Sequence, residues 1–186
     1  RSDLSESNIE IDNKVSVKSL YDTSEISIGD IDMTDTLSIS SYRVIATPAN
    51  VDIHINKIRT YAISASGYTL YELKKLDNGN FVYVSTLTSL KNTGIGQKEE
   101  PANFIVHAGN YVCYKGNSNG LAYHHTIGDE SNYSISEPNF SFTEEMTATL
   151  DGYHLSIQLI GDNIGIQYIN KEVDDIKEGN VFKDGN

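Results

Sequence analysis

The stretch VDIHINKIRTYAISASGYTLYELKKLDNGNFVYVSTLTSLK, residues 51–91, decides the fold of this chain. Near its start, apolar Ile53 and Ile55 alternate with polar residues, and this period of two predicts a β-strand with one buried face. The apolar positions then shift by one residue, so a β-bulge or bend is predicted near Asn56-Lys57. The stretch therefore opens on a strand whose register is irregular.

Two more strands are predicted in this stretch, joined by a tight turn at residues 77–80, DNGN. The Asn-Gly pair is a strong hairpin signal, because both residues accept the positive φ that a type I′ turn requires. Tyr68 and Leu70 lie on the strand before the turn, and Phe81 and Tyr83 lie on the strand after it. We therefore expect three consecutive antiparallel strands.

The rest of the body continues the pattern of short strands separated by turn residues. Strands are expected at residues 42–46, 103–107, 111–115, 121–125, 150–160 and 164–169. A turn is expected at residues 161–163, before the last of them. Strands at intervals of roughly eight to twelve residues are typical of a sandwich or a barrel. The predicted fold class is all-β, an antiparallel, jelly-roll-like β-sandwich with an extended N-terminal segment.

Three segments are predicted along the chain: an N-terminal segment (1–40), the sandwich (41–170) and an acidic linker or short tail (171–186). The first carries nine acidic and three basic side chains and alternates only weakly. It fits a docking or connector segment that joins the module to its own assembly by adding strands to another sheet. Two edge strands of the same domain fit it equally well. The abrupt start at Arg1 suggests a mature or excised part of a longer protein.

Composition and charge exclude several classes of partner. The 186 residues have a formal net charge of −12, whereas a nucleic-acid surface needs clustered basic residues. No apolar run approaches the length of a membrane span, so membrane insertion is not expected. The single cysteine, Cys113, cannot form an internal disulfide and is expected to pack as a small hydrophobic residue.

The tyrosine content, 12 Tyr with no Trp, suggests a binding surface on the predicted hairpin of residues 111–125. Tyrosines offer flat apolar faces on which a sugar stacks, and neighbouring amides bond its hydroxyl groups. The candidate ligand-binding residues are Tyr111, Tyr114, Lys115, Asn117, Asn119, Tyr123 and His125. In the alternative interpretation, these tyrosines fill the core and the asparagines only serve the turn.

Motifs for catalysis are absent from the sequence. There is no G-x-S-x-G, H-E-x-x-H or C-x-x-C motif and no Gly-rich phosphate loop. His124 and His125 are neighbours on a predicted strand and point to opposite faces, so they cannot enter one metal site together. We expect neither an enzyme nor a bound metal or cofactor.

Three segments carry a resemblance to a known group: IHINKIRTYAISASGYTLYELKK, FIVHAGNYVCYKGNSNGLAYHH and TLDGYHLSIQLIGDNIGIQYI. A Lys-Ile-Arg segment leads to a Gly-x-hydrophobic-x-hydrophobic strand, and an aromatic-rich hairpin follows the turn Ala108-Gly109-Asn110. This order resembles the jelly-roll β-sandwich modules of tailed-bacteriophage fibre and tail proteins and of surface glycan-binding proteins.

The resemblance implies a non-catalytic module of a virion fibre or surface appendage that mediates attachment to a host surface glycan or protein. It also implies a homo-oligomer, with a trimer as one form, located on a virion, in the extracellular space or at a cell surface. Two alternatives remain open from the sequence. One is a structural decoration or connector subunit of a virion, and the other is an accessory carbohydrate-binding domain of a larger hydrolase.

Overall fold

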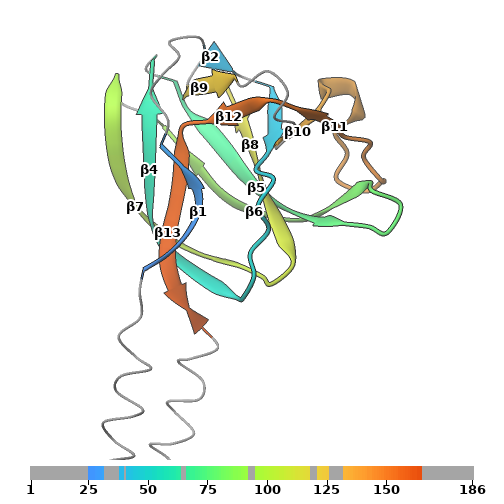
Figure 1. The fold of residues 1–186 in the computed structure, drawn as a ribbon, viewed down its shortest axis with the longest axis horizontal. Coiled ribbons are helices and arrows are strands. Elements are labelled where there is room, and N and C mark those ends of the chain that lie inside the picture. The colour runs from blue at the N-terminus through green and yellow to red at the C-terminus, as the bar shows by residue number, and fades with distance from the viewer. Residues whose placement is uncertain are drawn as a thin grey trace, which may run out of the picture.

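The structure, a computed structural model, describes residues 25–31, 38–39, 41–63, 66–91, 95–117, 121–125 and 132–164. In this part of the chain, strands form two sheets that pack against each other (Figure 1). The pairs of named strands are antiparallel. The predicted all-β antiparallel sandwich is confirmed.

The larger sheet has seven strands and is called the β4 sheet below. Its order is β1 (Ile26–Asp30), β13 (Ile157–Asn163), β4 (Ile53–Ala62), β9 (Leu121–His125) and β12 (Tyr153–Leu155). In addition, β7 (Gly96–Val106) pairs with β4, and β2 (Ser38–Ile39) pairs with β9. On the left of Figure 1, β7, β4, β13 and β1 run side by side.

The smaller sheet has six strands and is called the β5 sheet. Its order is β11 (Thr149–Asp151), β10 (Asn132–Ile135), β3 (Tyr42–Val44), β8 (Asn110–Gly116), β5 (Tyr68–Lys75) and β6 (Phe81–Leu90). A short 3-10 helix, η1 (Glu137–Asn139), follows β10. In the described part of the chain, no helix is long and apolar enough to cross a membrane.

The core between the sheets is apolar and receives side chains from both. Its buried members include Ile28, Ile53, Ile55, Ile58, Ile157 and Leu159 from the β4 sheet, and Tyr68, Leu70, Val112 and Tyr114 from the β5 sheet. Along β5 and β8 these inward residues alternate with outward ones, as the period of two requires. Burying each such side chain stabilises the fold by about 1.5–3 kcal/mol.

The irregular register predicted in the first strand is present in β4. The pairing of β4 with β7 shifts between Ile55 and Lys57, so the predicted bulge is confirmed. The pairing with β13 shifts at the same level, between Ile160 and Gly161. Gly161 therefore lies inside β13, and the turn predicted at residues 161–163 is wrong. A Cβ atom at Gly161 would lie 2.0 Å from the carbonyl oxygen of His54, so the glycine serves a close approach of two backbones.

The tight turn between β5 and β6 is present at the predicted place, but its type differs. The Leu76 amide donates to the Asn80 carbonyl at 2.8 Å, and the Gly79 amide donates to the Leu76 carbonyl at 2.9 Å. Gly79 has φ 87°, whereas Asn78, like every non-glycine residue described, has no positive φ. The type I′ prediction is therefore wrong, because the Asn78 side chain instead accepts the Asn80 amide at 3.0 Å and only Gly79 takes the left-handed conformation.

The long strand predicted at residues 150–160 is three short strands in the structure. β11 pairs in the β5 sheet, whereas β12 and β13 pair in the β4 sheet, so the chain passes from one sheet to the other. Strands that switch sheets at a bend form the corners of many sandwiches. The hairpin partner predicted at residues 164–169 lies outside the described residues, apart from Ile164.

The N-terminal boundary predicted at residue 40 is wrong for the residues described there. β1 pairs along β13, and β2 pairs with β9, so both are strands of the sandwich. Ile28 is 2% exposed, which gives β1 a share of the core. Of the two interpretations of this segment, edge strands of the same domain hold for residues 26–30 and 38–39. Residues 1–24 and the predicted tail at 171–186 lie outside the described residues.

Candidate binding surface

The predicted binding residues on β8 do not share a surface. Tyr114 points into the core between the sheets, is 0% exposed and packs against Tyr68 with ring centroids 5.6 Å apart. Its burial raises the pKa of the phenol. Tyr111 and Tyr114 are three residues apart on one strand, so they point to opposite faces. The prediction that Tyr114 stacks on a ligand is therefore wrong.

Tyr111 and Lys115 lie on the outer face of the β5 sheet, and both are engaged within the protein. The Tyr111 ring is half-buried and meets Phe81 edge-on, with centroids 5.3 Å apart. The Lys115 ammonium pairs with the Glu137 carboxylate and lies 5.0 Å from the centre of the Tyr42 ring. These contacts stabilise the fold, and they leave the predicted roles of both residues in ligand binding untested.

The predicted hairpin of residues 111–125 is wrong, because β8 pairs with β3 and β5 in the β5 sheet, whereas β9 pairs with β2, β4 and β12 in the β4 sheet. Asn117 is exposed, and its backbone amide donates to the Gly67 carbonyl at 2.9 Å. Asn119 lies outside the described residues. Tyr123 and His125 belong to β9, where their backbone pairs with Leu155 and Tyr153 of β12. Binding by these four side chains stays a prediction.

The structure instead gathers aromatic side chains on the outer face of the β5 sheet. Alternate positions of its strands supply Tyr42, Tyr71, Phe81, Tyr83, Tyr111 and Tyr133. Buried Val44, Leu73, Cys113 and Ile135 lie among them, so this face forms a second apolar cluster. Cys113 packs there as a small hydrophobic residue, as predicted, and burial raises the pKa of its thiol.

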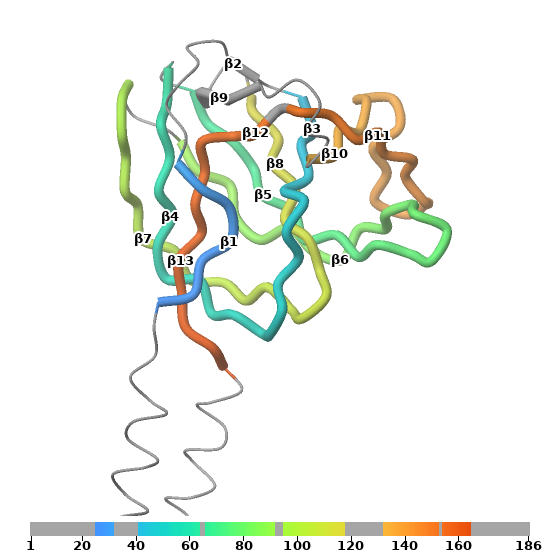
Figure 2. The backbone as a smooth tube through the Cα atoms, in the orientation of Figure 1, coloured from blue at the N-terminus to red at the C-terminus, as the bar shows by residue number. Residues whose placement is uncertain are grey.

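Residues 136–148, called the strap below, fold over this outer face between β10 and β11. In Figure 2 the strap lies beside the hairpin of β5 and β6, on the right of the view. Phe140 stacks on Tyr42 with centroids 3.9 Å apart and planes 9° apart. Met146 is 0% exposed, and its backbone exchanges hydrogen bonds of 2.9 and 2.8 Å with Phe81. The strap is thus held both by packing and by backbone pairing.

Two carboxylates of the strap also bind the sheet. Glu145 accepts hydrogen bonds of 2.9 Å from the side chains of Asn78 and Asn80 in the hairpin turn. These bonds lower the pKa of Glu145. Glu137 pairs with Lys115, as described above. The turn of the hairpin and the strap therefore position each other.

Four rings at the edge of the strap form what we call the aromatic ledge: Tyr71, Tyr83, Phe140 and Phe142. Phe142 is 56% exposed, whereas the other three rings of the ledge are half-buried. It meets Tyr83 at 5.0 Å and 81° and Phe140 at 5.3 Å and 84°. These contacts leave more than half of the Phe142 side chain accessible, so the ring can contact a flat partner.

Hydroxyl groups lie beside the ledge on β5 and β6. The Tyr83 hydroxyl and the Thr86 hydroxyl form a hydrogen bond of 2.9 Å, and those of Thr69 and Ser89 form one of 3.1 Å. Burial, followed by the nearby Cys113 thiol, raises the pKa of Tyr71, so its phenol is neutral. The ledge therefore combines one exposed apolar ring, Phe142, and three half-buried rings with neutral hydroxyl groups.

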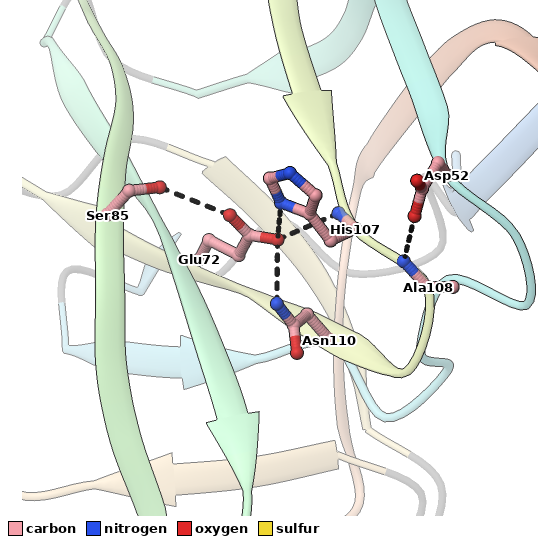
Figure 3. Close-up of polar contacts among 6 residues, drawn as sticks. All are labelled: Asp52, Glu72, Ser85, His107, Ala108 and Asn110. Carbon is pink, nitrogen blue, oxygen red and sulfur yellow. Dashed lines mark hydrogen bonds and ion pairs between the residues drawn. The ribbon is translucent and has the colours of Figure 1, made fainter. Parts of the chain in front are cut away.

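A second polar feature lies at the end of the core, where Glu72 of β5 is 1% exposed (Figure 3). The His107 amide and side-chain Nδ1 donate to its carboxylate at 2.8 and 3.0 Å, Asn110 donates at 2.9 Å, and Ser85 donates at 3.1 Å. Burial alone would raise the pKa of Glu72, but the bonds from Asn110 and His107 outweigh it and lower the pKa. Since both oxygens bind donors of the chain itself, Glu72 anchors the turn between β7 and β8.

Metal binding finds no support in this geometry. Within the described part of the chain, no group of three or more His, Cys, Asp and Glu side chains could hold a metal ion.

The sequence interpretation missed the ledge. Phe140 and Phe142 occupy alternate positions in the stretch 139–142, NFSF. Their alternation was the available signal, but nothing in it shows that they meet Tyr71 and Tyr83, more than fifty residues earlier in the chain.

Comparison with known proteins adds a likeness of fold only. No protein-family model and no curated protein matches the sequence. Among solved structures, one similar to this chain is that of the cysteine protease and lectin-like domains of Cwp84, a surface layer associated protein of Clostridium difficile. The TM-score is 0.43 and the identity 12%, and the match covers 66% of this chain and 31% of that chain. A likeness of this size is no argument for a shared function.

Proposed function

We propose that this chain is a non-catalytic attachment module that binds the sugars of a surface glycan on its aromatic ledge. The observation that carries the proposal is Phe142, which is 56% exposed although three neighbouring rings hold it in place. Leaving a large apolar ring in water is unfavourable, by roughly 25 cal/mol for each Å² of apolar area. A fixed, exposed ring of this kind is suited to binding a partner that covers it.

The chemistry of the ledge favours a sugar as that partner. A pyranose ring has a flat face of C–H groups that packs on an aromatic ring, and hydroxyl groups at its edge that need hydrogen-bond partners. The ledge offers Phe142 for the first and the hydroxyl groups of Tyr83 and Thr86 for the second.

The module is further proposed to belong to a virion fibre or another surface appendage. The support is the resemblance of its strand and turn order to modules of phage fibres and surface glycan-binding proteins. A single exposed ring provides little contact area, so one copy binds weakly, and several copies on one appendage would multiply the effective affinity.

A glycan array with the wild type, Phe142→Ala and Ile105→Ala tests this proposal. Ile105 is a matched control, because it is also an exposed apolar residue, 41% exposed, but lies on β7 of the other sheet. We expect the wild type and Ile105→Ala to bind the same glycans, and Phe142→Ala to bind them at least about tenfold more weakly, a loss of about 1.4 kcal/mol. No binding by the wild type, or equal binding by Phe142→Ala, would overturn the proposal.

A further inference from the structure

The strap carries three acidic residues near the ledge, and two of them are engaged in holding the fold. Glu137 pairs with Lys115, and Glu145 accepts from Asn78 and Asn80. The third, Glu144, is exposed, and no described residue pairs with its carboxylate. Glu144 is therefore the acid of the strap that is available to a ligand.

The backbone of Glu144 is held close to that of Phe142 by a local turn. The chain bends over residues 142–144, and the Ser141 hydroxyl oxygen accepts the amides of Thr143 at 3.2 Å and Glu144 at 3.0 Å. Phe142 lies inside this turn, two residues before Glu144. A hydroxyl that bonds the backbone in this way stiffens a turn, so the side chains of Phe142 and Glu144 start from backbone positions that are fixed two residues apart.

From this arrangement we infer that Glu144 determines the specificity of the ledge: its carboxylate accepts hydrogen bonds from two adjacent hydroxyl groups of a neutral sugar stacked on Phe142. An ionised carboxylate is an acceptor only, and its two oxygens match a pair of vicinal hydroxyl donors. Hydrogen bonds to a charged acceptor are stronger than neutral ones. The inference rests on the proposed binding of glycans at the ledge.

The same charge distribution disfavours acidic sugars. A sialic acid or uronic acid is bound best beside a free cation, but the charge of Lys115 is offset by its pairing with Glu137. Glu144 and the net charge of −12 repel an anion approaching this face. The ligand class is therefore a neutral saccharide with adjacent free hydroxyl groups.

The experiment is a glycan array of matched pairs, in which each neutral glycan is printed beside the same glycan capped with sialic acid or bearing a uronate. It is probed with the wild type, Glu144→Gln and Glu99→Gln. Glu99 is a control, because it is an acid with a half-exposed side chain on the outer face of the other sheet. We expect the wild type and Glu99→Gln to bind the neutral member of a pair at least about tenfold better than the acidic one. Glu144→Gln should bind neutral glycans about tenfold more weakly than the wild type does. Its preference for the neutral over the acidic member of a pair should also be smaller.

Two outcomes would overturn the inference, and they differ in what else they affect. In the first outcome, glycans bind in a Phe142-dependent way, but the acidic member of a pair binds as well as the neutral one, or Glu144→Gln binds like the wild type. Only the proposed role of Glu144 then fails. If the wild type binds no glycan, or Phe142→Ala binds as well as the wild type, the proposed function fails with it. Circular dichroism of Glu144→Gln should match the wild type, since no described residue depends on this carboxylate.

Discussion

On the outer face of the β4 sheet, polar side chains pair across neighbouring strands, whereas the outer face of the β5 sheet is built from aromatic rings. His54 bonds to Asn103 at 2.7 Å, and Arg59 bonds to Glu99 at 2.7 Å on the first face. The second face has the rings of the β5 sheet and the strap that covers part of them.

This difference shows where a ligand can be accommodated. The first face can meet water directly, because its polar groups bond both to one another and to solvent. The second face is too apolar to be left bare, and the strap covers part of it. The ledge lies where the rings Phe140 and Phe142 of the strap meet Tyr71 and Tyr83 of the sheet, so Phe142 is both packed against other rings and accessible.

The largest expected effect tests whether the aromatic face is a core. Leu73 points to this face and is 0% exposed, so Leu73→Ala should lower the free energy of unfolding by about 2–5 kcal/mol. Arg59→Ala on the opposite outer face should leave the midpoint of urea denaturation unchanged. A cost below about 1 kcal/mol for Leu73→Ala would mean that this face behaves like ordinary surface.

A second, smaller effect concerns the buried charge inside the sandwich rather than either outer face. Glu72→Gln should lower the free energy of unfolding by about 1–3 kcal/mol at pH 7, because it weakens bonds to a buried charged acceptor. The folded-state pKa of Glu72 lies below its ordinary value, so its contribution is full above the unfolded pKa and is lost as pH falls through the folded pKa.

Urea denaturation of the wild type and of Glu72→Gln at pH 7 and near pH 3 measures this effect. The difference between their free energies of unfolding should be smaller at the lower pH. Glu144→Gln, an exposed acid of the strap, provides the control and should match the wild type in urea at pH 7. A difference for Glu72→Gln that stays constant with pH would contradict the role of the ionised carboxylate.

The smallest expected effect on stability is that of Phe142→Ala. Because the ring is 56% exposed, its removal should lower the melting temperature by less than about 3 °C, although glycan binding is expected to weaken at least about tenfold. Thermal unfolding followed by circular dichroism checks this. A much larger shift would show that Phe142 supports the strap, and its exposure would then need no ligand to explain it.

Much of the fold could be predicted from local patterns. The alternation around Ile53 and Ile55, the shift before Lys57 and the Asn-Gly turn at Gly79 are all encoded within a few residues, and each has its counterpart in the structure. The wrong predictions came from local signals that are compatible with two different structures. Gly161 resembled a turn, but it is a glycine required by the close backbone of His54 in the neighbouring strand.

The binding surface was less predictable. Tyr111 and Tyr114 were grouped because they are close in sequence, although alternation alone places them on opposite sides of β8. The ledge joins Tyr71 and Tyr83 to Phe140 and Phe142, and no local pattern connects these segments.

The sequence by itself determined that the chain forms strands, where several of them bend or turn, and that the side chains of each strand alternate between two faces. The tertiary structure alone decided which side became the core. Both sides of β5 are apolar enough to be buried, as Leu70 and Leu73 show, and only packing against the β4 sheet gave one side to the main core. The strap then packed on the other side, and the aromatic ledge formed where its rings meet those of the sheet. The physical reason is that burial is a property of contacts between distant segments, whereas periodicity is a property of neighbours along the chain.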